Sequence, residues 1–197
     1  MSRPRAVVAT RNEHKLRELA GVLDSLELVP LADQVVLPPE LGETFSDNAL
    51  GKARAAHAAT GLAAIADDSG IEARALDGRP GVHSARYAGQ DASDQENLDL
   101  LRRELADATD RSVTYVCALA YIDEDGGEYL FDGRCEGQLA PYPRGSGGFG
   151  YDPAFVPNDT GPGDQRTMAE LSSAEKHAIS HRGRAARELA SWLKAQS

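Results

Sequence analysis

Cysteine, long apolar runs and positive charge are all scarce in this sequence, and each shortage excludes a class of protein. The 197 residues include two cysteines, Cys117 and Cys135, without a CxxC pair or zinc-finger spacing. Both lie in apolar, strand-like runs, so we expect buried thiols rather than a disulfide. A disulfide-stapled fold and a cysteine-rich zinc site are therefore excluded.

The charge balance argues against nucleic acid as a partner. Acidic residues outnumber basic ones by 31 to 21, giving a net charge of −10, whereas a duplex-binding surface needs clustered cations. A few lysines in one site could still bind a small anionic substrate. No apolar run is long enough to span a membrane, and the run 6–9 is too short for a signal peptide core. We expect a cytoplasmic protein without a membrane partner.

The length and composition that are present indicate one ordinary globular domain, which we predict to span residues 1–197. Apolar spacing predicts strands alternating with helices in the first third of the chain. The expected elements are strand 6–10, helix 12–23, strand 26–31, helix 44–60 and strand 62–66. This repeated strand–helix–strand pattern predicts the α/β class.

Turn and capping signals divide the rest of the chain. Ser93 and Glu96, like Ser172 and Glu175, form the capping-box pattern that begins a helix. The expected elements are strand 71–76, helix 93–105, strands 112–122 and 128–135 joined by a hairpin at 123–127, and one long helix from 172 to about 193. Residues 137–140 could extend the second strand of the hairpin.

Two adjacent carboxylates, Asp67 and Asp68, follow the apolar run Ala64–Ala66. We expect the strand to end there, with Ser69 and Gly70 forming a turn. Neighbouring side chains of a strand point to opposite faces, so one carboxylate could face a ligand while the other contacts a neighbour or a metal. Taken alone, the stretch is more typical of a solvated turn than of a functional site.

A second polar group surrounds the predicted start of the first helix. Thr10 and Glu13 have capping-box spacing, and Asn12 and Lys15 lie beside them. Backbone N–H groups at a helix N-terminus favour anions, and a lysine one turn later adds a full positive charge. The stretch predicts either a triphosphate site or an ordinary capped surface helix.

Other motifs point to less specific chemistry. The glycine-rich stretch Arg144–Pro153 matches the spacing of a dinucleotide loop, but a proline follows where a helix should begin. It remains a flexible loop on which Phe149 could stack against a base. His177 and His181 have helical i,i+4 spacing, yet no H-E-x-x-H motif accompanies them, which argues against zinc.

The remaining polar residues suit a magnesium-bound nucleoside triphosphate that is attacked by water. Hard carboxylate oxygens suit Mg²⁺, and lysines suit phosphate. The carboxylates are Glu40, Asp67 and Asp68, and the cations are Lys15, Lys52, Lys176 and Arg182.

Six motifs, in order along the chain, make the sequence resemble the inosine/xanthosine triphosphate pyrophosphatases. They are Thr10–Lys15, Thr44–Lys52, Ala66–Gly70, Pro80–Tyr87, Gly148–Pro153 and Glu175–Arg182. The resemblance implies an elongated α/β fold with a long central mixed sheet, two lobes, an active-site cleft and a homodimer. It also implies Mg²⁺-dependent hydrolysis of ITP, dITP and XTP to the monophosphate and pyrophosphate.

The resemblance also implies roles for individual residues. Asp68 corresponds to the general base, and Glu40, Asp67 and Asp68 to metal ligands, with Glu43 as an alternative to Glu40. Residues at substrate-binding places are Thr10, Arg11, Asn12, Glu13, His14, Lys15, Lys52, Ser69, Phe149, Gly150, Tyr151, Asp152, Lys176, His181 and Arg182.

Two alternatives stay open at this point. One is a pyrophosphatase of related fold that acts on modified pyrimidine triphosphates, and the other is a nucleotide-binding sensor without catalysis. If the protein is instead a pyrophosphatase of deaminated purine nucleotides, Arg182 could select the base. Its guanidinium can only donate hydrogen bonds, so it would bind a 6-keto purine and disfavour the 6-amino group of adenine.

Overall fold

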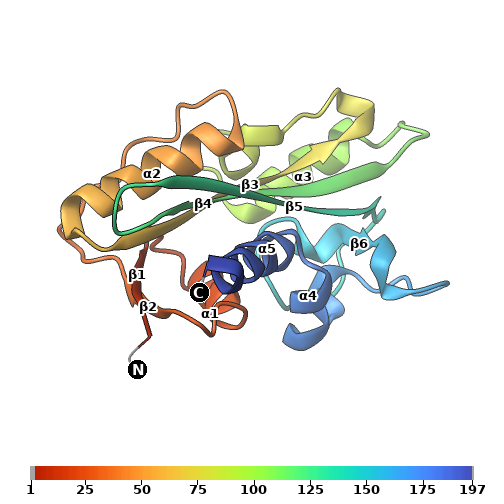
Figure 1. Ribbon diagram of the computed structural model, residues 1–197. Coiled ribbons are helices and arrows are strands. Elements are labelled where there is room, and N and C mark those ends of the chain that lie inside the picture. The colour runs from red at the N-terminus through yellow and green to blue at the C-terminus, as the bar shows by residue number, and fades with distance from the viewer. Residues whose placement is uncertain (1–2, 197) are drawn as a thin grey trace. The chain divides into compact units, whose positions relative to one another are not determined.

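The computed structural model describes residues 3–196 and contains one six-stranded sheet with five α-helices among these residues (Figure 1). The strands are β1 (Arg5–Val8), β2 (Glu27–Pro30), β3 (Ala63–Ala73), β4 (Ser112–Ile122), β5 (Glu128–Leu139) and β6 (Phe155–Pro157). The helices are α1 (Glu13–Ala20), α2 (Phe45–Thr60), α3 (Asp94–Glu104), α4 (Ser173–Ile179) and α5 (His181–Gln196).

The sheet is mixed, with strand order β2-β1-β3-β4-β5-β6. Strand β1 pairs in parallel with β2 and β3, whereas β5 and β6 are antiparallel. Pro30 and Pro157 end the two edge strands, where a missing N–H costs little pairing. The predicted α/β class is confirmed.

The chain divides into two compact units, neither of which is one continuous stretch. Unit 1 comprises residues 1–68, 117–133 and 182–197, and unit 2 comprises residues 69–116 and 134–181. Strands β3, β4 and β5 each supply residues to both units. The expectation of a single domain spanning 1–197 stays a prediction.

Unit 1 buries both faces of its part of the sheet. Along β1, Ala6 and Val8 pack in a cluster with residues of α1 and α5, while Val7 packs with Ala49 and Ala53 of α2. Figure 1 shows α2 on one side of these strands and α1 and α5 on the other. Because strand side chains alternate between faces, strands buried on both faces read as continuous apolar runs.

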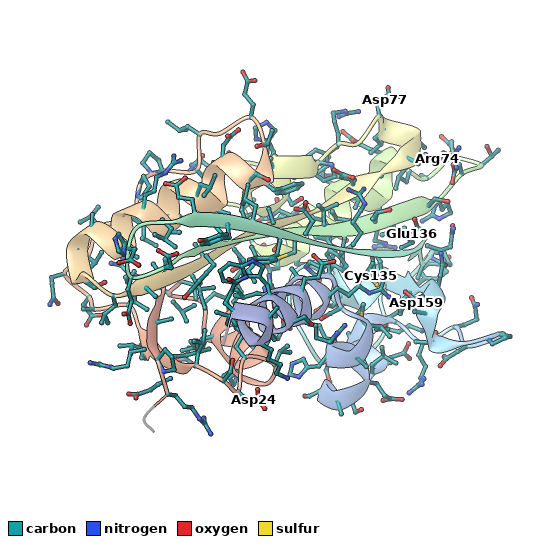
Figure 2. The ribbon with its side chains drawn as sticks, viewed as in Figure 1. Asp24, Arg74, Asp77, Cys135, Glu136 and Asp159 are labelled. Carbon is teal, nitrogen blue, oxygen red and sulfur yellow. The ribbon has the colours of Figure 1, made fainter. Side chains whose placement is uncertain are left out.

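Unit 2 has its own core, in which α3 packs against the strands. Leu98, Leu101 and Leu105 cluster with Cys135 and Phe155. Figure 2 labels Cys135 and its neighbour Glu136 on β5; the cysteine is buried and the glutamate exposed, as strand alternation requires. Cys117 and Cys135 are both buried thiols, as expected.

Strand β3 corrects the prediction that a strand ends at Asp67 and Asp68 and that Ser69 and Gly70 form a turn. Residues 63–73 form one continuous strand. The separate strand expected at 71–76 does not exist: residues 71–73 belong to β3, and Arg74–Leu76 form a short 3-10 helix. Acidic residues ordinarily end a buried strand because a lone buried charge is costly. Here both carboxylates have cationic or amide partners, which removes that cost.

Two helix predictions were also wrong in part. The long helix expected from 172 to about 193 is two helices, because Ser180 has an extended backbone with ψ of 148°. His177 and His181 therefore do not share a helix face. The first helix begins one residue after Asn12, which caps it, so the predicted Thr10–Glu13 capping box is not the cap used.

Other predictions held. Ser93 and Ser172 cap α3 and α4 with complete capping boxes, and β5 does extend to Leu139. Strand β6 was not predicted, since three residues carry too little periodicity to recognise. Within residues 3–196, none of the helices has the length and apolarity needed to cross a lipid bilayer.

Candidate active site

The start of α1 gathers the first predicted phosphate contacts in unit 1. The Asn12 side chain accepts hydrogen bonds from the backbone N–H groups of His14 and Lys15, at 2.9 and 3.3 Å. Thr10 Oγ1 accepts from Asn12 N at 3.1 Å, and Arg11 donates to the carbonyls of the loop after β2. Thr10, Arg11 and Asn12 line a pocket of about 500 Å³, whereas His14 and Lys15 are not part of its lining. The capped helix start thus borders a space open to a ligand.

Lys15 turns from α1 towards Asp67, and the two form the edge of a buried ion-pair network. Lys15 Nζ lies 2.9 Å from Asp67 Oδ2, and the same oxygen accepts from Nε and Nη2 of Arg182 at 3.0 and 2.9 Å. Arg182 Nη1 donates to Glu18 Oε2 at 2.5 Å. The Arg182 side chain is 2% exposed and that of Glu18 is 8% exposed. Arg182 thereby joins α5 to both α1 and β3.

The network sets the charge of Asp67. Burial raises the pKa of this carboxyl, but the positive charges of Arg182, Lys15 and Lys52 outweigh burial and hold the pKa well below its usual range. Burial lowers the pKa of Arg182, yet Asp67 and Glu18 together raise it above its ordinary value. Asp67 is therefore an ionised counter-charge for two cations.

Asp68, the next residue of β3, has a different set of partners. Asn48 Nδ2 of α2 donates to Asp68 Oδ2 at 2.9 Å, and Lys52 Nζ lies 3.7 Å from Asp68 Oδ1. Lys52 Nζ also donates to Glu40 Oε1 at 2.5 Å and to the Asp67 carbonyl at 2.7 Å. The two aspartates thus have different side-chain partners, and which of them faces a ligand or a metal stays a prediction.

The surroundings of Asp68 shift its pKa in the direction that suits a base. Burial raises the pKa most, and Glu40 raises it further, while Lys52 and Asn48 lower it; the net shift is upward. Burial lowers the pKa of Lys52, but Asp67, Asp68 and Glu40 outweigh burial and keep the ammonium charged. A carboxylate with a raised pKa lies beside a fixed positive charge.

The donor set can be tested against a magnesium ion. Among residues 3–196, no group of three or more acidic, histidine or cysteine side chains converges as an all-protein metal site would require. Glu40 and Asp68 nevertheless both approach one cation, the Lys52 ammonium. Magnesium in nucleotide enzymes commonly takes one or two carboxylates and fills its other positions with phosphate oxygens and water. Glu40 and Asp68 fit that kind of site, whereas Glu43 is exposed.

In unit 2, Asp152 gathers several of the residues expected to contact a base. Lys176 Nζ donates to Asp152 Oδ2 at 2.8 Å, and Phe149 N donates to the same oxygen at 2.9 Å. The Lys176 ammonium also lies 5.1 Å from the centre of the Phe149 ring. A Cβ on Gly148 would come within 2.0 Å of Asp152 Oδ2, so the glycine allows the loop to fold this closely.

Tyr115 of β4 connects this cluster to His181. Its hydroxyl donates to Asp152 Oδ1 at 3.1 Å, and its ring stacks on His181 with centroids 4.6 Å apart and planes 13° apart. Tyr151 is turned away from Asp152, because its hydroxyl donates to the Ser84 carbonyl at 2.7 Å. Gly150 N donates to Asp94 of α3.

Not every predicted contact joins these clusters through its side chain. Glu13 and His14 both contact Arg17 on the exposed side of α1. Ser69 is half-buried in β3, on the unit 2 side of the division. Arg182 was expected to contact a base, whereas its hydrogen bonds described above go to Asp67 and Glu18. These roles stay predictions.

Three buried residues that hold the clusters together were given no role from the sequence. They are Glu18, Asn48 and Tyr115. Glu18 and Asn48 lie at helical spacing from Lys15 and Lys52, at i+3 and i−4, so they share helix faces with predicted site residues. The shared face of Asn48 and Lys52 is visible in the sequence, and the same signal could have identified Glu18. No local pattern marks Tyr115.

Known proteins resemble this chain in sequence and in fold. The model of the Ham1 family matches residues 6–192. A dITP/XTP pyrophosphatase of Mycobacterium tuberculosis is 52% identical over 188 residues, covering 91% of this chain and 90% of that protein. A solved HAM1 protein of Coxiella burnetii is 41% identical with a TM-score of 0.87, covering 98% of this chain and 99% of that one. A nucleoside-triphosphatase, dITP/XTP pyrophosphatase, of Mycobacterium abscessus is 45% identical with a TM-score of 0.75, covering 96% and 98%.

Proposed function

The chain belongs to the Ham1 family, and on this basis we propose that it is a hydrolase that converts dITP and XTP to the monophosphates and pyrophosphate. The observation that carries the chemistry is the cluster in unit 1 where Asp68, Lys52 and Glu40 meet. ITP, which shares the hypoxanthine base of dITP, is a further substrate. The enzyme thereby removes deaminated purine nucleotides from the nucleotide pool.

The cations of unit 1 bind the triphosphate. Lys15 and Lys52 carry charges that can pair with phosphate oxygens, and the N–H groups at the start of α1 add partial positive charge. Thr10 and Asn12 shape that helix start. Stabilising negative charge on the departing pyrophosphate is the largest contribution we expect from these residues.

Asp68 is the general base that takes a proton from the attacking water. Its carboxylate is held at one oxygen by Asn48 and lies near Lys52 through the other. A positioned base of this kind contributes about 10²–10⁴-fold to a rate. Asp67, by contrast, serves as the counter-charge that keeps Lys15 and Arg182 in place.

Glu40 and Asp68 would hold Mg²⁺ together with the phosphates, and the ion would supply positive charge to the phosphate oxygens. The charges on the chain support this assignment. Three cations, Lys15, Lys52 and Arg182, face four carboxylates, Glu18, Glu40, Asp67 and Asp68, for a formal balance of −1. A triphosphate adds several negative charges, so a further cation is needed to bind it.

Base selection is assigned to residues of unit 2. The Phe149 ring offers a stacking surface, and the Lys176 ammonium beside it can only donate hydrogen bonds. A 6-keto group accepts such a bond, whereas the 6-amino group of adenine would face a cation. A direct contact between Arg182 and the base, which the family resemblance implies, stays a separate prediction.

A substrate panel tests the function. The purified protein is incubated with ITP, dITP, XTP, ATP, dUTP and methylated pyrimidine triphosphates, and pyrophosphate and phosphate are measured separately. We expect pyrophosphate from the first three with Mg²⁺ and none with EDTA, and ATP hydrolysed far more slowly. Equal rates on ITP and ATP, or release of phosphate alone, would refute the proposal.

The Asp68→Asn variant tests the base assignment. Turnover should fall by at least about two decades while the KM for ITP stays within a few-fold. Near-normal turnover would remove Asp68 from the mechanism without changing the substrate assignment. The homodimer, the cytoplasmic location, and the lobes and cleft implied by the resemblance also belong to the proposal.

A further inference from the structure

We propose that Asn48 is a positioning residue that fixes the carboxylate of Asp68 and ties it to the loop carrying Glu40. The inference rests on the proposed role of Asp68 as the base. Asn48 lies in the first turn of α2 and is 5% exposed. A buried amide needs partners for both its oxygen and its nitrogen, so its contacts identify what it holds.

The two ends of the Asn48 amide bind two different segments. Asn48 Oδ1 accepts a hydrogen bond from Gly42 N at 2.7 Å, and Asn48 Nδ2 donates to Asp68 Oδ2 at 2.9 Å. The Gly42 N–H can only donate, so the oxygen must face Gly42 and the nitrogen must face Asp68. The orientation of the amide is thereby determined by chemistry, and its N–H group is directed at the carboxylate.

Asp68 is thus restrained at both of its oxygens from one helix. Asn48 binds Oδ2, while Lys52, one turn later on α2, lies 3.7 Å from Oδ1. Rotation of the carboxylate about its Cβ–Cγ bond would break the hydrogen bond with Asn48. A base that is held in one orientation spends less time misaligned with the attacking water, so the reaction is faster.

The loop before α2 is bound by the same amide. A Cβ on Gly42 would lie 2.7 Å from Asn48 Oδ1 and 2.8 Å from Asp47 Cβ, so only glycine allows this approach. Two residues earlier, Glu40 contacts Lys52. Asn48 and Lys52 therefore anchor the loop at two points, and Asn48 connects the position of Glu40 with that of Asp68.

The test is a double-mutant cycle between Asn48→Ala and Asp68→Asn, with kcat and KM for ITP measured in Mg²⁺. In the wild-type background, Asn48→Ala should lower kcat by about 10- to 100-fold, the range for losing a hydrogen bond to a charged group. The KM should change by less than about threefold. In the Asp68→Asn background, Asn48→Ala should have almost no further effect on kcat, because the residue acts through Asp68.

A second variant separates the two ends of the amide. Asn48→Asp has the same shape and keeps an acceptor for Gly42, but it loses the donor to Asp68. We expect its kcat to fall at least as far as that of Asn48→Ala. Retention of wild-type kcat by Asn48→Asp would mean that only the loop contact matters, and it would overturn the proposal.

Asn97 of α3 provides a matched control in unit 2. It is 2% exposed, its Oδ1 accepts from Ala88 N at 2.8 Å, and its Nδ2 donates to the Ala85 carbonyl at 3.1 Å. Asn97→Ala should lower the melting temperature about as much as Asn48→Ala while kcat stays within about threefold of wild type. If the loss of kcat were a general effect of removing a buried asparagine, kcat would fall in both Asn48→Ala and Asn97→Ala.

The remaining outcomes are decisive. An equal loss of kcat in both Asp68 backgrounds would show a structural role independent of the base, and wild-type kcat in Asn48→Ala would show no role. Either result overturns the inference even if Asp68→Asn is inactive. Near-normal turnover of Asp68→Asn would instead refute the proposed base itself, so the two failures are distinguishable.

Discussion

Glu18→Gln should destabilise the protein strongly, although it changes a single oxygen to an NH₂ group on a helix. Glu18 Oε2 and Arg182 Nη1 are 2.5 Å apart, and their side chains are 8% and 2% exposed. The substitution keeps the shape of the side chain and removes its charge. Arg182 then retains Asp67 as a partner but has lost half of the negative charge that its two carboxylate partners supply.

The size of the effect follows from burial. Removing one partner of a buried ion pair costs about 3–5 kcal/mol, and glutamine keeps an oxygen acceptor, so we take the lower end, about 3 kcal/mol. A protein of 197 residues loses roughly 2–4 °C of Tm for each kcal/mol. We therefore expect the Tm of Glu18→Gln to fall by roughly 6–12 °C.

Glu128→Gln is the matched control in the same unit. Glu128 accepts from Arg54 Nε and Nη2 at 2.7 and 2.6 Å, and the paired side chains are 37% and 58% exposed. Water screens such a pair, so its loss should shift the Tm by less than about 2 °C despite the better geometry. The two variants remove the same chemical group and differ mainly in burial.

Calorimetry gives both Tm values, and urea unfolding followed through Trp192, the sole tryptophan, reports on α5 in unit 1. Equal shifts for the two variants would refute the reasoning, since burial would then not set the cost. An unchanged Tm in Glu18→Gln would likewise show that Arg182 does not depend on Glu18.

Three further predictions concern charge and the two clusters. Burial raises the pKa of Asp67, but Arg182 and Lys15 hold this pKa well below the unfolded value of about 3.9. The stability that the ionised carboxylate supplies is therefore present above that pH and is lost as the pH falls below it. In Lys15→Met, the urea midpoint should fall less steeply on acidification than in the wild type. Lys52→Met should lower kcat on ITP by about 10²-fold, and near-normal pyrophosphate release would contradict its role. Tyr115→Phe removes the hydroxyl bound to Asp152 and keeps the stack on His181. It should raise the KM for ITP about tenfold, with kcat within about twofold of wild type. An unchanged KM would show that the position of Asp152 does not affect substrate binding.

The sequence predicted the local features of the fold well. The capping boxes at Ser93 and Ser172 and the hairpin at 123–127 depend on residues within a few positions of each other, so their patterns survive in the sequence. The break at Ser180 was missed, because serine does not prevent helix formation and the apolar spacing continues past it.

The errors in the candidate site have a common physical cause. Asp67 and Asp68 looked like the end of a strand because carboxylates are costly inside a sheet, and their partners Lys15, Asn48 and Arg182 are remote in the sequence. Glu18 was not singled out, because its partner Arg182 is likewise remote in the sequence. Partners that come from other elements have no local signature, so motif matching found the residue types but not their pairing.

The division of the chain into units has a consequence for how the protein is made. Arg182 lies 115 residues after Asp67 and 164 residues after Glu18, and unit 1 includes all residues from 182 onward. During synthesis from the N-terminus, the two acidic residues exist for most of translation before the guanidinium that neutralises them. Unit 1 therefore completes its fold after the whole of unit 2 has been synthesised, and until then Glu18 and Asp67 lack the arginine that binds both of them in the folded protein.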